Sequence, residues 1–157
     1  MGTCISKYPE SRKLPKFLEP KFLPEYIPQL DSGRVIKVYD GDTITIASKV
    51  PNLKHSLIYK FSVRLNGIDS PEIKSNNKDE KKMALQARNA LSDKILNKDV
   101  YLKNIKKEKY GRLLCDVYLV DENINEWMIK ERYAVIYDGG TKKSPDSWIE
   151  YHSHNII

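Results

Sequence analysis

Apolar residues alternate with polar ones over five short stretches of this chain, and a period of two is typical of β-strands. Between the third and fourth stretches, apolar residues recur every three or four positions, which predicts a helix over 79–97 with Asp79 as its candidate cap. A second helix is expected over 124–133 and a short turn over 145–152. This order favours an α+β fold over a doubly wound sheet. The five expected strands cover residues 34–39, 43–48, 57–68, 100–105 and 113–120.

Prolines punctuate the segment before the first expected strand, at positions 9, 15, 20, 24 and 28. Such spacing is typical of an extended spacer or of a strap along a domain. We therefore expect an N-terminal tail over 1–33 and one domain over 34–157. Phe17, Phe22 and Tyr26 are the tail side chains expected to pack against that domain.

The formal net charge of the chain is +6. The expected tail holds five basic and four acidic residues, so most of the excess lies in the domain. A basic surface attracts polyanions such as nucleic acid, although lysine-rich composition also serves solubility alone. The most concentrated basic run is Lys106, Lys107 and Lys109, shortly before Arg112.

Acidic residues stand at two expected turns. Asp42 follows Gly41 between two strands, a position that by itself indicates only a hairpin turn. Asp69 ends the third expected strand, and Pro71 stiffens the chain between it and Glu72. Together these oxygen ligands suit calcium or magnesium, and the lack of neighbouring His and Cys argues against zinc. The spacing also excludes an EF-hand, which needs a glycine at loop position 6 and a glutamate at position 12.

Two arginines accompany these acids. By strand alternation the Arg64 side chain points to the opposite face of its strand from Val63 and Leu65. Arg112 follows the turn at Gly111. Each alone is an ordinary candidate for a surface salt bridge. As a pair beside a cation, however, two guanidinium forks match phosphate oxygens and neutralise charge that builds up on phosphorus. The combination predicts a phosphodiesterase site.

Three strings carry these residues in order, and over about 34–143 they resemble the staphylococcal nuclease-like, or thermonuclease, domain family. The resemblance implies a five-stranded OB-type β-barrel with helices packed on it, which cuts DNA and RNA with calcium and leaves 3′-phosphate ends. Family members usually continue into a third long helix, whereas this chain has only the expected turn at 145–152. The strings are Val38-Tyr39-Asp40-Gly41-Asp42-Thr43, Val63-Arg64-Leu65 leading through Gly67-Ile68-Asp69 to Pro71-Glu72, and Lys109-Tyr110-Gly111-Arg112.

The resemblance also implies roles for individual residues. The catalytic positions are Arg64, Glu72 and Arg112; we expect Glu72 to act as general base on a water that attacks phosphorus in line. The implied calcium ligands are Asp42, Asp69 and the backbone carbonyl of Ser70, with Asp40 as a supporting carboxylate. Nucleotide contacts are expected from Lys109, Tyr110 and Tyr137, with Tyr133 the alternative to Tyr137.

The first six residues, Met-Gly-Thr-Cys-Ile-Ser, fit the pattern for myristoylation at Gly2, with Cys4 available for palmitoylation. Two acyl chains, or one chain with basic residues, give stable membrane binding, and the tail offers both. The alternative is a chance match. With no secretory block and no segment long enough to span a bilayer, we expect an intracellular, cytoplasmic protein anchored at the cytoplasmic face of a membrane.

Two further functions compete with the enzyme. One is a non-catalytic nuclease-like OB module that binds nucleic acid or protein. The other is an anchored scaffold for membrane recruitment. Modules of the first kind lose the acidic and arginine positions, and this chain has lost none. No obligate protein partner is implied.

Overall fold

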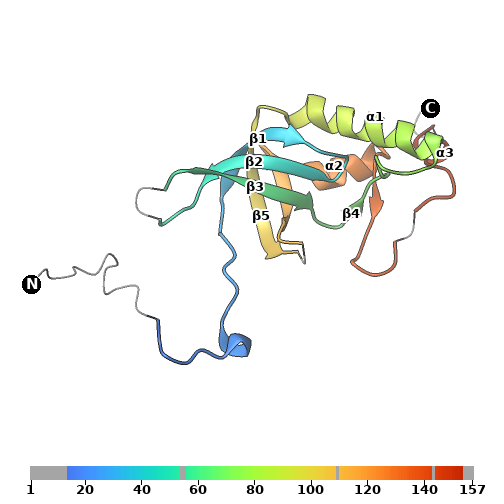
Figure 1. The fold of residues 1–157 in the computed structure, drawn as a ribbon. Coiled ribbons are helices and arrows are strands. Elements are labelled where there is room, and N and C mark those ends of the chain that lie inside the picture. The colour runs from blue at the N-terminus through green and yellow to red at the C-terminus, as the bar shows by residue number, and fades with distance from the viewer. Residues whose placement is uncertain (1–13, 54–55, 109, 143, 154–157) are drawn as a thin grey trace, which may run out of the picture.

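A closed β-barrel forms the body of the molecule (Figure 1). The computed structural model describes residues 14–53, 56–108, 110–142 and 144–153. Neighbouring barrel strands run antiparallel in the order β3-β2-β1-β5-β6, and a parallel pairing of β3 with β6 closes the barrel. With three helices packed on it, this is the OB-type α+β fold that the sequence predicted. The barrel strands are β1 (Ser32–Val38), β2 (Thr43–Lys49), β3 (Ile58–Leu65), β5 (Asp99–Lys107) and β6 (Leu113–Leu119).

The alternating apolar positions point into the barrel, where they form the core. Val35, Ile44, Ile46, Val63 and Leu65 are fully buried. Because each strand contributes every second residue to the interior, the other residues face outward and are free to be polar. The inward residues thus fix the register that places the functional side chains at the strand ends.

The described part of the chain also contains three α-helices. The longest, α1 (Lys78–Ile95), buries Ala87 and Leu91 against the barrel, as its spacing predicted. Its cap is Asn77 and not Asp79: the Asn77 side chain accepts from the backbone N–H of Asp79, so Asp79 lies inside the first turn. The second helix, α2 (Ile124–Lys130), is shorter than predicted. The expected turn at 145–152 is a short helix, α3 (Trp148–Ser153), which packs against α1.

The third predicted strand is in fact two strands. It breaks after β3 at Asn66-Gly67, where Gly67 has a φ of 77°, a conformation that glycine adopts without strain. The chain then forms β4 (Ile68–Asp69), which pairs with β8 (Val135–Ile136) outside the barrel sheet. This break turns Asp69 back toward the end of β3. A further short strand, β7 (Glu122–Asn123), pairs antiparallel with β6 at the end of the sheet order.

The described residues before β1, from residue 14 on, lie outside the barrel and include the 3-10 turn η2 (Pro20–Phe22) (Figure 1). The expectation that the aromatic side chains of this segment pack on the domain is wrong, because Phe17, Phe22 and Tyr26 are 74–83% exposed. Packing is done instead by Ile27 and Leu30, which are aliphatic and lie next to β1. No helix in the described part of the chain combines the length and hydrophobicity needed to cross a bilayer.

Gly41 lies in the hairpin between β1 and β2, at a place where neighbouring atoms leave no room for a side chain. Its φ lies outside the left-handed region, so backbone conformation does not require a glycine here. A Cβ atom at Gly41 would lie 2.7 Å from the Cβ of Ser70 and 3.1 Å from that of Ala87. The hairpin, the segment after β4 and helix α1 therefore meet at this glycine.

We predict that Gly41→Ala destabilises the protein by about 1–3 kcal/mol, because the new methyl group overpacks a contact between three elements. The free energy of unfolding in urea measures the effect. Gly140→Ala is the matched control, since a Cβ there meets only the flexible side chain of Asp138. Equal stability of the two variants would contradict this account of Gly41.

Candidate active site

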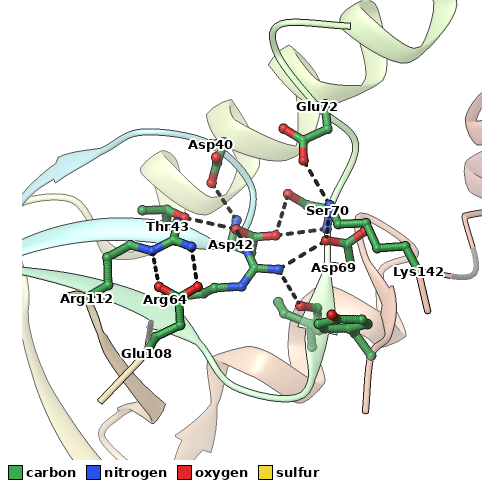
Figure 2. A network of polar contacts seen from close by, with 12 residues as sticks. Asp40, Asp42, Thr43, Arg64, Asp69, Ser70, Glu72, Glu108, Arg112 and Lys142 are labelled. Carbon is green, nitrogen blue, oxygen red and sulfur yellow. Dashed lines mark hydrogen bonds and ion pairs between the residues drawn. The ribbon is translucent and has the colours of Figure 1, made fainter. Parts of the chain in front are cut away.

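The guanidinium of Arg64 lies between two buried carboxylates (Figure 2). Its Nη1 donates to Oδ1 of Asp42 at 2.5 Å, and its Nη2 donates to Oδ1 of Asp69 at 3.1 Å. Nη2 also donates to the backbone carbonyl of Ile68 at 3.3 Å. The Arg64 side chain is 14% exposed and both aspartate side chains only 4%. The surface salt bridge that an isolated arginine suggested is therefore not what forms here.

Local structure explains why these three residues meet. Arg64 pairs with Thr43 across β3 and β2, so Asp42 at the hairpin turn lies beside it. Asp69 returns to Arg64 because the chain turns at Gly67 and enters β4. Two tight turns, one before β2 and one after β3, thus bring Asp42 and Asp69 to the same guanidinium.

The carboxylate of Asp42 accepts donors on both of its oxygens. Oδ1 accepts from the Thr43 hydroxyl at 3.0 Å as well as from Arg64. Oδ2 accepts from the backbone N–H and the hydroxyl of Ser70, at 3.0 and 3.2 Å. Ser70 therefore lies beside Asp42, and in this structure it contributes its N–H and hydroxyl there. Hydrogen bonds of this number offset the cost of burying a charged group.

Asp40 stands next to Asp42 and accepts from its backbone N–H at 3.1 Å. Burial, together with the negative charge of Asp42, raises the pKa of Asp40 to about 6. A carboxyl whose folded-state pKa is raised favours folding fully at pH values below its ordinary pKa of 3.8. That contribution is lost as the pH rises through about 6. Asp40 is thus held near Asp42, which it repels when both are charged. A nearby cation would reduce the free-energy cost of this repulsion.

Lys142 joins the acids from the segment after β8 (Figure 2). Its Nζ lies 2.9 Å from Oδ1 of Asp69 and 2.9 Å from Oε1 of Glu72. The side chain of Glu72 is 59% exposed, unlike the two aspartates. Sequence reasoning missed Lys142, because it stands in no motif and lies 70 residues from Glu72.

Arg112 forms a two-pronged ion pair with Glu108. Its Nε and Nη2 each donate to one carboxylate oxygen at 2.9 Å. Hydrogen bonds from Arg112 lower the pKa of Glu108. The backbone N–H of Glu108 donates to the carbonyl of Arg112, which closes the turn between β5 and β6. The sequence prediction did not include Glu108. The signal that could have identified it is its position four residues before Arg112, across the turn between β5 and β6.

Two neighbouring cavities open at this cluster. The first, of about 490 Å³, is lined by Asp40, Asp42, Arg64, Ser70, Glu72, Tyr110, Arg112, Tyr137 and Lys142, among others. The second, of about 580 Å³, shares Arg64, Glu108 and Tyr137 with the first and continues to Lys106 and Lys107. The fold therefore gathers the predicted acids and arginines at one place, although their roles stay predictions.

The predicted nucleotide-contacting residues have different fates. Tyr137 lines both cavities, whereas Tyr133 stacks on His152 at 4.7 Å and does not line either. Tyr110 is 72% exposed and lines the first cavity. Lys109 and the predicted acylation sites Gly2 and Cys4 lie outside the described residues.

The donor chemistry fits a hard cation. Asp42 and Asp69 offer buried carboxylate oxygens, Asp40 adds a third acid beside Asp42, and the cationic groups of Arg64 and Lys142 already gather there. Oxygen ligands of this kind suit calcium or magnesium. Within the described residues no three acidic, histidine or cysteine side chains form a ready-made metal cluster. Residues 42 and 69 would therefore hold an ion together with oxygens from other sources, such as water or phosphate.

Comparison with known proteins agrees with this geometry. The family model described as staphylococcal nuclease homologue matches residues 62–153, more than half of the chain. The chain belongs to the staphylococcal nuclease homologue family. The matched part contains Arg64, Asp69, Glu72, Arg112 and Lys142, while Asp40 and Asp42 precede it.

Individual relatives carry names that agree with the family. An uncharacterized endonuclease of Haemophilus influenzae is 36% identical over 104 residues, which cover 66% of this chain and 51% of the relative. A probable endonuclease of Schizosaccharomyces pombe is 31% identical, over 68% of this chain and 56% of the relative. An uncharacterized endonuclease of Escherichia coli is 30% identical, over 68% of this chain and 61% of the relative. The chain thus spans between about half and three fifths of the length of these family members.

We predict that Arg64→Met lowers the free energy of unfolding by about 3 kcal/mol or more in the presence of a chelator. The reason is that two buried carboxylates lose their shared counter-charge. Urea unfolding at low ionic strength measures the loss. Arg34→Met is the control: Arg34 also forms a two-pronged pair, with Asp99, but both side chains are more than 60% exposed, so little change is expected. Equal losses in the two variants would show that the Arg64 network is energetically ordinary.

Proposed function

We propose that this chain is a calcium-dependent nuclease that hydrolyses phosphodiester bonds of DNA, RNA or both. The observation that carries the proposal is the convergence of Asp42, Arg64, Glu72 and Arg112 on the walls of one cavity. Buried acids beside two arginines suit a site that must bind both a cation and a phosphate. Membership of the staphylococcal nuclease homologue family, whose relatives are named endonucleases, supports the same conclusion.

The two arginines bind the phosphate in this proposal. Guanidinium groups stay charged at neutral pH and match phosphate oxygens with two parallel hydrogen bonds. Arg64 is held in the cavity wall by the two aspartates and Arg112 by Glu108, so both positive charges are in place before substrate arrives. Such preorganised positive charge lowers the barrier for a phosphorus that gains a fifth oxygen.

Glu72 is the proposed general base. It lines the same cavity, and its carboxylate is exposed enough to meet a water molecule. Glu72 takes the proton of that water while the oxygen attacks phosphorus in line, and the bond to the 5′ oxygen of the next nucleotide breaks; that oxygen takes up a proton from solvent water and leaves as a hydroxyl. The product then carries a 3′-phosphate. When bound by Asp42, Asp69 and Ser70, with Asp40 in support, calcium supplies positive charge that stabilises the phosphate in the transition state.

The larger cavity provides room for the nucleotide. Tyr137 lines it together with Arg64, and Lys106 and Lys107, the last two residues of β5, line it as well. A base stacked on a tyrosine gains about 1–3 kcal/mol, and lysines neutralise the neighbouring phosphates. Tyr110, which lines the smaller cavity together with Arg112, completes the proposed nucleotide contacts, and Lys109 is proposed as a further contact from its place in the sequence motif.

Acylation at Gly2 and Cys4 is the proposed route to a membrane. The sequence pattern at the N-terminus supports it, and the segment 14–26 that follows leads away from the barrel (Figure 1). A nuclease domain on such a spacer would act at the cytoplasmic face of a membrane. This part of the proposal is independent of the catalytic part.

We predict that Glu72→Gln lowers calcium-dependent cleavage of single-stranded DNA by about 10²- to 10⁴-fold, because the amide cannot take a proton from water. Gel assays on heat-denatured DNA, with calcium and with excess chelator, measure the rate. Glu126→Gln is the control, since Glu126 is an exposed acid on α2 that lines neither cavity. Cleavage by Glu72→Gln at the wild-type rate would remove the role assigned to Glu72. DNA binding without cleavage by the wild-type chain would favour the non-catalytic module.

We predict that Gly2→Ala removes the chain from cell membranes, because myristoylation requires an N-terminal glycine after loss of Met1. Fractionation of cells that express each form of the full chain measures membrane content. Cys4→Ser separates the second acyl chain from the first, and it is expected to reduce membrane content less than Gly2→Ala. Unchanged membrane content in Gly2→Ala would defeat the anchor.

A further inference from the structure

Lys142 contacts both the buried and the exposed acid of the site. Its ammonium nitrogen lies 2.9 Å from Asp69 and 2.9 Å from Glu72, while its own side chain is 47% exposed (Figure 2). Asp69 Oδ1 accepts from Arg64 as well. Two cationic groups therefore share one oxygen of a residue that is 3% exposed.

These contacts place Lys142 in competition with any metal ion. Asp69 is one of the two buried carboxylates with the donor chemistry for a hard cation. A divalent ion that takes the Asp69 carboxylate must share it with an ammonium or displace that ammonium. Arg64 is only 14% exposed and is held by Asp42 and Ile68 too, whereas Lys142 reaches in from an exposed segment. Lys142 is therefore the group that yields more easily.

The segment that carries Lys142 is suited to such a movement. It follows Tyr137 and passes through Gly139, whose φ is 90°, and Gly140. Its described local hydrogen bonds are few: the Tyr137 hydroxyl donates to the carbonyl of Gly140, and the N–H of Gly140 donates to Asp138. A lysine side chain also has several rotatable bonds, so its ammonium can leave the acids without a change in the barrel.

We propose that Lys142 is a built-in counter-ion of the metal-free site, which pairs with Glu72, competes with calcium for Asp69 and is released into the cavity when the ion binds. This inference rests on the proposed calcium-dependent function. Release has two consequences for the reaction. Glu72 is freed from an ammonium that would oppose its action as a base, and a positive charge becomes available to substrate phosphate in the same cavity. Lys142 thereby links binding of the ion at Asp69 to the release of Glu72 and to binding of the substrate phosphate.

The pKa of Lys142 agrees with a role as a resident cation. Partial burial by itself lowers the pKa, but hydrogen bonds to Glu72 and Asp69 outweigh that effect and raise it. The group therefore stays charged near neutral pH, and its departure from the acids is a movement of the ammonium and not a loss of its proton.

The test is calcium binding by the full chain, measured by isothermal titration calorimetry at fixed ionic strength. Lys142→Met removes the ammonium and keeps the length of the side chain. We expect the Kd for calcium to fall about threefold or more, because two ion pairs no longer have to be broken. Lys74→Met is the matched control: it removes one exposed charge from the same cavity, and no described ion pair joins Lys74 to the acids. Its Kd is expected to change by less than about twofold.

Thermal melting in excess chelator gives a second readout that needs no ion. Without calcium, Lys142→Met is expected to melt below the wild type and below Lys74→Met, since Asp69 has lost a counter-charge. With saturating calcium the difference is expected to shrink. A Kd for Lys142→Met that equals that of Lys74→Met, or a chelator melting point equal to that of the wild type, would overturn the inference.

Failure of this inference differs from failure of the proposed function. If the wild-type chain cleaves DNA with calcium but Lys142→Met binds calcium no more tightly than Lys74→Met, only the role of Lys142 is wrong. If the wild type binds no measurable calcium, the inference still expects binding by Lys142→Met. Absence of binding in both would defeat the calcium site and the inference together.

Discussion

The guanidinium of Arg64 holds together Asp42 and Asp69, two carboxylates that would otherwise repel each other inside the protein. Each buried acid alone would be costly, since desolvation of a charge outweighs most single contacts. Both accept from the Arg64 guanidinium, and Asp42, which also accepts from Ser70 and Thr43, lines the cavity. The chemistry proposed for the site depends on this arrangement, because the same contacts that stabilise the acids also hold the Arg64 guanidinium at the cavity wall.

The site lies where it does because the barrel strands end there. The β1–β2 hairpin, the break after β3 and the turn between β5 and β6 contribute Asp42, Asp69 and Arg112 respectively. A rigid core fixes the spacing of these turns, while polar residues at the turns are free of core packing. Membership of the staphylococcal nuclease homologue family agrees with this use of the barrel. Glu72 and Lys142, by contrast, come from segments outside the barrel. That position suits a proposed general base, Glu72, and a side chain proposed to change its contacts, Lys142.

Much of the fold followed from local patterns. Period-two alternation predicted the barrel strands, and helical spacing predicted the buried side of α1, because side-chain direction depends only on the backbone repeat. Errors arose at the ends of elements and in the N-terminal segment. Gly67 divides the third strand, Asn77 and not Asp79 caps α1, and the aromatic side chains of Phe17, Phe22 and Tyr26 stay exposed. In each case the sequence contained the residue, but several local arrangements were compatible with it.

The sequence by itself determined the family, the α+β barrel and the identity of the acids and arginines available for chemistry, because these rest on residue type, order and short-range spacing. Only the tertiary structure decided which charges share an atom. That Arg64 bridges Asp42 to Asp69 and that Lys142 reaches Asp69 and Glu72 depends on contacts between distant segments. Coulomb interactions act through space and burial strengthens them, so charge pairing across 70 residues leaves no periodic trace along the chain.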